Sequence, residues 1–137
     1  MAALTADRNT RRKEDEHAAY KVKGGANIRG GGMVAVDAND LAQPAADSAG
    51  LKFVGIARQA VDNTAGADGD VMVPVWRTNV FGLATGSDLT GHIGELAYAL
   101  DDQTVDLTGN TQHQVKVGAI SEVDDAGNAW IDIERKA

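Results

Sequence analysis

Cysteine is absent from the 137 residues, which excludes disulfide bonds and thiolate metal sites. No apolar run is long enough to cross a membrane, and the N-terminus lacks the apolar core of a signal peptide. Aromatic residues make up only 4% of the chain, so a core must consist mainly of aliphatic side chains. We therefore expect a protein of the cytosol, or of a particle assembled there, with no membrane partner.

Basic residues are scarce overall and concentrated at one end. The net charge is −7, but residues 1–29 hold seven basic and four acidic side chains and are net +3. The remaining chain holds six basic and sixteen acidic side chains and is net −10. An acidic body repels nucleic acid, so we expect no nucleic-acid partner, whereas the basic end suits a negatively charged surface such as that of another protein.

Residues 1–19 are mostly polar, have no apolar period, and form a charged N-terminal arm in our interpretation. Arg11, Arg12 and Lys13 are followed at once by three acidic residues. Such a segment is disordered in the isolated protein or becomes ordered on a partner. A short helix is the third alternative, because Arg, Lys and Glu are good helix formers.

Residues 20–137 predict a single all-β domain. Short alternating or apolar runs recur about every 8–12 residues between glycine-rich and Asx-rich turns, which indicates eight or nine strands in a small jelly roll or β-barrel-like sandwich. Residues 53–76 predict a hairpin. Gly55 marks a bulge or a close backbone approach, and Pro74 marks an edge strand or a bulge. Trp76 is expected to point away from Val71, Val73 and Val75.

The C-terminal half of the chain predicts a second set of hairpins. Residues 96–107 contain two apolar runs separated by a turn, whereas 87–95 suggests one helical turn capped by Ser87 or Asp88. Alternation after residue 114 places Val115, Val117 and Ala119 on one face. The same reasoning turns Ile131 and Ile133 inward and Trp130 outward.

The sequence contains no recognisable catalytic or cofactor pattern. The glycine run of residues 24–32 lacks the Lys-Ser/Thr of a phosphate loop, so turns explain it better. Asp62, Asp68 and Asp70 share one loop but do not fit a calcium-binding spacing, and backbone hydrogen bonds explain them better. The three histidines (His17, His92 and His113) are far apart, and no serine lies in a nucleophile elbow. We expect neither an enzyme, nor a cofactor, nor a metal site.

Several segments resemble the small decoration, or cement, proteins of tailed-phage capsids. These segments are "MVAVD", "PAADSAGLKFVGIA", "AVDNTAGADGD", "VWRTNVF", "GELAYALDDQTVDLT" and "VGAISEVDDAGNAWIDI", and the resemblance covers Tyr20 to Ile133. It implies a small β-barrel or jelly roll that binds the outer surface of the phage head after assembly in the host cytoplasm. It also implies homo-dimers or homo-trimers at capsid symmetry axes, which bridge neighbouring major capsid proteins and stabilise the DNA-filled shell.

Two sets of residues are candidates for contacts in that role. Arg8, Arg11, Arg12 and Lys13 of the arm would meet acidic patches of the capsid. Met72, Trp76, Phe81 and Trp130 are large groups in predicted strands, and each either fills the core or forms a self-interface. The alternative functions are another virion component (a tail, neck or host-surface-binding module) and, less compatible with the sequence, a small β-barrel hydrolase or lyase.

Overall fold

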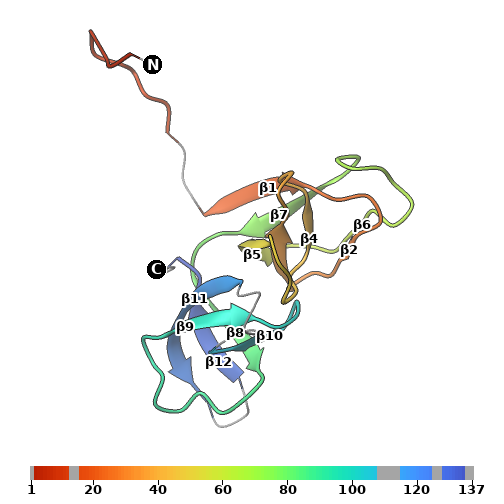
Figure 1. Cartoon of the computed structure of the whole chain (residues 1–137), viewed down its shortest axis with the longest axis vertical. Coiled ribbons are helices and arrows are strands. Elements are labelled where there is room, and N and C mark those ends of the chain that lie inside the picture. The colour runs from red at the N-terminus through yellow and green to blue at the C-terminus, as the bar shows by residue number, and fades with distance from the viewer. Residues whose placement is uncertain (1, 13–15, 108–114, 125–127, 135–137) are drawn as a thin grey trace.

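The computed structural model describes residues 2–12, 16–107, 115–124 and 128–134, and it is all-β, as the sequence predicts (Figure 1). No described residue is helical, and residues 87–95 form successive turns, so the expected helical turn is wrong. The described residues contain twelve strands, more than the eight or nine expected, because several are only two or three residues long. The strands are β1 His17–Lys21, β2 Asn27–Ile28, β3 Met33–Val36, β4 Ala42–Pro44, β5 Lys52–Ala57, β6 Val61–Asp62, β7 Met72–Trp76, β8 Val80–Thr85, β9 Leu96–Ala99, β10 Thr104–Asp106, β11 Lys116–Val123 and β12 Asn128–Asp132.

The N-terminal strands form a curled five-stranded sheet. Its order is β1-β7-β5-β3-β4, and every neighbouring pair is antiparallel. The sheet curls enough for Val22, just after β1, to form a parallel bridge with Ala42 of β4. The two-stranded ribbon β2-β6 lies beside this sheet (Figure 1).

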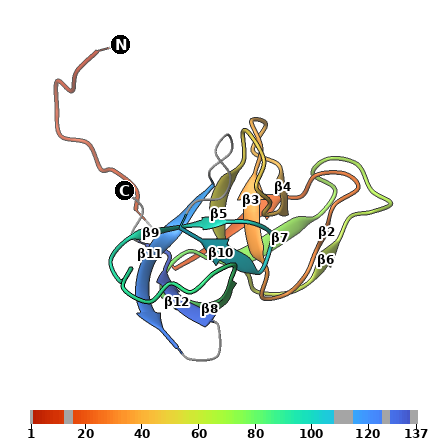
Figure 2. The ribbon, with the colours of Figure 1, turned by 60° about the horizontal axis from the view of Figure 1, so that its bottom comes forward.

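The C-terminal strands form a closed five-stranded barrel in the order β10-β8-β12-β11-β9 (Figure 2). The expected hairpin of residues 96–107 is confirmed, since β9 and β10 pair antiparallel. Closure comes from the parallel pairing of β10 with β8. Closure leaves each of the five described barrel strands with a neighbour on both sides, although β8 pairs with β10 only at Ala84 and Thr85.

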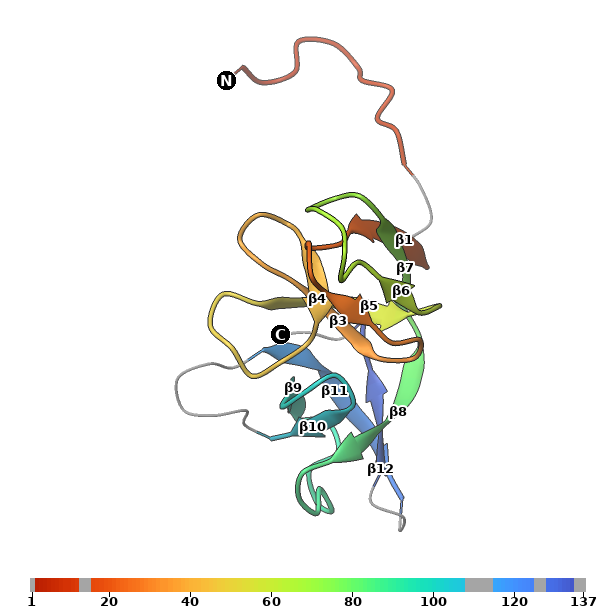
Figure 3. The ribbon, with the colours of Figure 1, turned by 90° about the vertical axis from the view of Figure 1, so that its right-hand side faces the viewer.

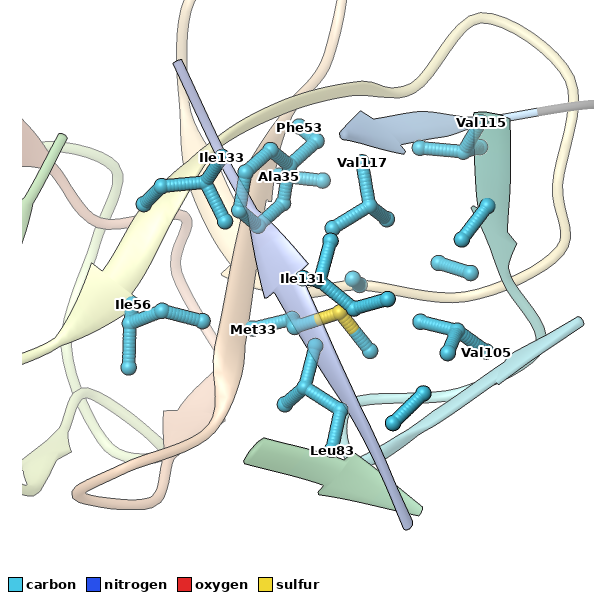
Figure 4. Packing of buried hydrophobic residues seen from close by; sticks show 14 of the residues in the cluster. Met33, Ala35, Phe53, Ile56, Leu83, Val105, Val115, Val117, Ile131 and Ile133 are labelled. Carbon is cyan, nitrogen blue, oxygen red and sulfur yellow. The ribbon is translucent and has the colours of Figure 1, made fainter. Parts of the chain in front are cut away.

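Both faces of the five-stranded sheet contribute to a buried core. One face, with Val34, Val73 and Val75, packs into a small core that includes Ile28 of β2. Alternate residues on the other face pack against the barrel in the larger core, as Figure 4 shows for Met33 and Phe53 beside Ile131. Ile131 and Ile133 are buried as predicted, at 0% and 1% exposure. The barrel therefore packs against one face of the sheet and covers part of it.

Gly55 occupies a bulge of β5, as its place in an apolar run predicts. The β3–β5 register shifts beside it, and its φ is 155°. A Cβ atom there would lie 2.3 Å from the carbonyl oxygen of Trp76. The prediction that Pro74 lies in an edge strand is wrong, since its strand, β7, lies between β1 and β5. The strand tolerates Pro74 because its pairing with β5 ends at Val75, and the Pro74 carbonyl still accepts a bond from the Arg58 N–H at 2.9 Å.

Candidate docking surface at the root of the N-terminal arm

The N-terminal arm projects away from the folded body in all three views of the ribbon (Figures 1, 2 and 3). Residues 2–12 belong to no strand or helix, and all of them are exposed, including Arg8, Arg11 and Arg12. Lys13 lies outside the described residues. The arm is shorter than predicted, because strand β1 begins at His17 and so takes residues 17–19 into the sheet. Three guanidinium groups are therefore presented to solvent ahead of a sheet strand.

The strand that continues the arm has a free backbone edge. Strand β1 is the last strand of its sheet and pairs only with β7 in the sheet order. Glu16 and Val22 form backbone hydrogen bonds towards β7, and the alternation of an antiparallel ladder assigns the residues of even number to that side. The backbone groups of His17, Ala19 and Lys21 therefore point the other way. Among the described residues, no other strand pairs with His17 or Ala19 on that side. The edge closes at the end of β1, because the parallel bridge of Val22 with Ala42 occupies the Lys21 carbonyl, and the Lys23 N–H donates to the Ala42 carbonyl at 2.9 Å.

An apolar strip lies on the sheet face next to this edge. Met72, Pro74 and Trp76 of β7 share the face that the barrel covers farther along the sheet. The barrel covers the β3 and β5 portion, but Met72 is 51% exposed and Pro74 is half-buried. Ala19 and Lys21, their register partners on β1, are exposed on the same face. The strip is therefore an uncovered continuation of a buried sheet face.

Trp76 connects this strip to the base of the arm. Its ring lies 4.6 Å from the ring of His17, and the guanidinium carbon of Arg58 lies 4.6 Å from the Trp76 ring centroid. One edge of the indole also packs against the larger core. Trp76 therefore anchors His17, the first residue of β1, to the body. Its prediction as a residue that points away from Val73 and Val75 is confirmed.

The four large residues that were predicted to fill the core or form a self-interface lie at different places in the structure. Met72 and Trp76 belong to the strip beside the arm, whereas Phe81 is half-buried against the larger core. Trp130 is 42% exposed on the outer wall of the barrel, opposite Gly82, so a place in the core is wrong for it. Sequence reasoning missed the Arg58–Trp76–His17 stack, because these residues come from three separate segments and no local pattern connects them.

The residues that were considered as metal ligands or catalytic groups form hydrogen bonds with nearby groups. Asp68 accepts a bond from the Gly24 N–H at 2.8 Å, and Asp70 accepts one from the Ala67 N–H at 2.9 Å, as the turn interpretation predicts. His92 pairs with Glu95 at 2.6 Å. Within the described ranges, no three His, Cys, Asp or Glu side chains are grouped as metal ligands. His113 lies outside the described residues.

Carboxylates that cap turns have lowered pKa values. Hydrogen bonds from the Leu41 and Asn39 N–H groups lower the pKa of Asp37, and Thr90 and Thr64 do the same for Asp88 and Asp62. A lowered folded-state pKa stabilises the protein above the unfolded value of about 3.9 and is lost as the pH falls through the folded value. These groups therefore favour the fold at neutral pH.

We expect the melting temperature to fall as the pH drops below about 4, because protonation removes the charge that these turn N–H groups stabilise. Asp37→Asn should flatten this dependence, since an amide oxygen still accepts the bonds but does not titrate over this range. Thermal unfolding followed by circular dichroism from pH 7 to pH 3 measures the effect. An unchanged pH profile in Asp37→Asn would show that Asp37 does not contribute.

Comparisons of the chain with protein-family models, with curated proteins and with solved structures found no match. Among the described residues, no helix is long and apolar enough to cross a membrane. The strip at Met72 and Pro74 lies beside the free β1 edge, and the exposed basic arm precedes β1 in the chain. We call these three features together the arm-root surface.

Proposed function

We propose that this protein is a capsid decoration protein that binds the outer surface of a tailed-phage head through its arm-root surface and stabilises the DNA-filled shell. The observation that carries the proposal is the apolar strip beside the free β1 edge, in the strand that the exposed basic arm precedes in the chain. The resemblance of residues 20–133 to cement proteins supplies the identity of the partner, a major capsid protein.

Each feature of the arm-root surface fits a different part of a docking interaction. The edge at His17 and Ala19 can accept an extended capsid segment as an additional strand, and the strip would pack against its side chains. The arginines would attract an acidic capsid patch, although each exposed ion pair contributes only about 0–1 kcal/mol. An acidic body opposes this attraction, so the charge separation orients the protein with its arm towards the shell.

Stabilisation of the shell then follows from binding linkage. A protein that binds only the expanded, assembled lattice lowers the free energy of that lattice. Contacts repeated around the shell reinforce one another when copies are joined as homo-oligomers at symmetry axes, even if each contact is weak. Trp130 and the neighbouring Val80, both exposed on the barrel wall, provide the apolar surface for such self-association.

Removing the arm is expected to weaken binding to heads about tenfold or more, because several charge contacts and the chain leading to the β1 edge are lost. The deletion should cover residues 2–12 only, because a cut through His17 would remove the stack on Trp76. Co-sedimentation of the variant with DNA-filled heads measures occupancy, and heads without the protein should release DNA at a lower temperature than decorated heads.

Charge variants distinguish the effect of the arm's arginines on head binding from the effect of losing positive charge anywhere in the protein. Arg8→Gln, Arg11→Gln and Arg12→Gln together should reduce head occupancy and make it less sensitive to salt. Arg29→Gln, Lys52→Gln and Lys116→Gln together are a matched control that also removes three charges, since all three residues are exposed on the body. A chain that stays in solution, or that sediments with tails only, would overturn the capsid proposal.

A further inference from the structure

A polar pocket of about 410 Å³ opens at the mouth of the barrel. It lies between the segment that follows β8 and the facing ends of β11 and β12. This mouth is at the bottom of Figures 1 and 3, at the opposite end of the molecule from the arm. The pocket is within the size range of small-molecule sites, which occur preferentially at places such as barrel mouths.

The pocket combines an apolar floor with a polar rim. The half-buried Val123 provides the floor, and the fully buried Leu89 lies beneath the surface there. Carboxylates of Asp88 and Asp124, the amide of Asn128 and three hydroxyl groups provide the rim. An apolar surface beside many hydrogen-bonding groups matches the two sides of a sugar ring, which presents C–H groups on its faces and hydroxyl groups around its edge.

The rim carboxylates are held in place by short-range hydrogen bonds. Asp88 Oδ1 accepts bonds from the Thr90 N–H at 3.0 Å and from its hydroxyl at 2.7 Å. Asp124 Oδ1 accepts a bond from the Asn128 N–H at 3.1 Å. A fixed acceptor loses little conformational entropy when a ligand binds. Two carboxylates on the rim disfavour anionic ligands, and the hydroxyl groups and the amide beside them suit a neutral, hydroxyl-rich molecule.

We propose that this pocket binds a neutral hexose or N-acetylhexosamine unit of a glycan. Asp88 and Asp124 accept bonds from sugar hydroxyl groups, and the sugar face lies on the floor at Val123. If the arm faces the shell, the pocket faces outward, towards any glycan-coated surface that the particle meets.

The test uses the full-length protein and defined sugars. Glucose, galactose, mannose and N-acetylglucosamine are titrated into ¹⁵N-labelled protein, with sialic acid as an anionic comparison. We expect at least one neutral sugar to shift the amide signals of Thr90 and Asn128 in a saturable way. Asp88→Asn should weaken that binding about tenfold, since a hydrogen bond to a charged acceptor is replaced by one to a neutral amide.

Two comparisons keep the proposal falsifiable. Glu122→Gln removes an exposed carboxylate of β11 that does not line the pocket, and it should bind sugar as the wild type does. Asn128→Ala is a second rim variant, and its spectrum reports whether the barrel remains folded. The absence of any saturable shift, equal binding of sialic acid, or shifts produced by Ca²⁺ alone would each overturn the proposal. These titrations use no capsid, so they succeed or fail independently of the decoration function.

Discussion

Gly118→Ala is expected to lower the free energy of unfolding by about 3 kcal/mol or more, a large share of the total stability of a small protein. Gly118 is buried in β11, where β9 approaches on one side and β12 on the other. A Cβ atom at this position would lie 2.2 Å from the Asp132 carbonyl oxygen and 2.9 Å from the carbonyl carbon. These are backbone atoms, so no side chain can rotate away, and β12 itself would have to move.

Gly82→Ala is the matched control for this prediction. Gly82 is also a strand glycine of the barrel, but an added Cβ atom would lie 3.6 Å or more from the Trp130 ring, which is ordinary contact. We expect its effect to be within about 0.5 kcal/mol. Urea unfolding followed by tryptophan fluorescence gives both values with one method. Equal stabilities of the two variants would show that the barrel can relax around position 118.

The prediction of which β11 side chains face the core fails next to Gly118. Strict alternation predicts that Ala119 joins Val115 and Val117 in the core. The register of β11 shifts between Lys116 and Gly118, so Ile120 is buried and Ala119 is only half-buried. A bulge adds one residue to one strand, and every later side chain then changes face. The composition of a strand does not reveal this shift unless its partner strand is known.

The candidate site shows a similar division between local and nonlocal information. The arm was predictable, because its charge pattern and lack of apolar period are local properties of the chain. The free edge of β1 and the strip at Met72 were not, because they depend on which strands become neighbours and how far the barrel covers the sheet. Pro74 illustrates the difficulty: its missing N–H suggested an edge strand, yet β7 is an inner strand and β1, its neighbour, is at the edge.

Asn63→Asp is expected to destabilise the protein by about 3 kcal/mol or more at neutral pH, and by more than Asn63→Ala. Asn63 is 3% exposed, and its Nδ2 group contacts the carbonyl oxygens of Val22, Lys23 and Ala67 at 2.9–3.2 Å. A carboxylate would direct a negative oxygen at three acceptors without donating to any of them. Both variants retain the backbone bonds of residue 63, so their difference isolates the buried charge.

The pH dependence of Asn63→Asp distinguishes a buried charge from a simple loss of contacts. Burial beside carbonyl oxygens raises the pKa of the new carboxyl group above its unfolded value of about 3.9. Its destabilisation should therefore be smallest below about pH 4 and should grow as the pH rises towards the raised folded value. Asn63→Ala should show the same pH profile as the wild type. Parallel profiles for all three proteins would mean that water reaches the new carboxylate.

The hydrogen bonds of Asn63 also bear on docking, because they hold the chain at one end of the free β1 edge. Its bonds to Val22 and Lys23 hold the chain where it leaves β1 and closes against β4, while the bond to Ala67 holds the long loop before β7. The far end of β1 is held by Trp76, with Arg58 on the other side of the stack. The free edge is thus fixed at both ends before any partner binds, which reduces the entropy lost when another strand pairs with it. Loosening the Asn63 end should therefore weaken head binding even while the arm and its arginines remain intact.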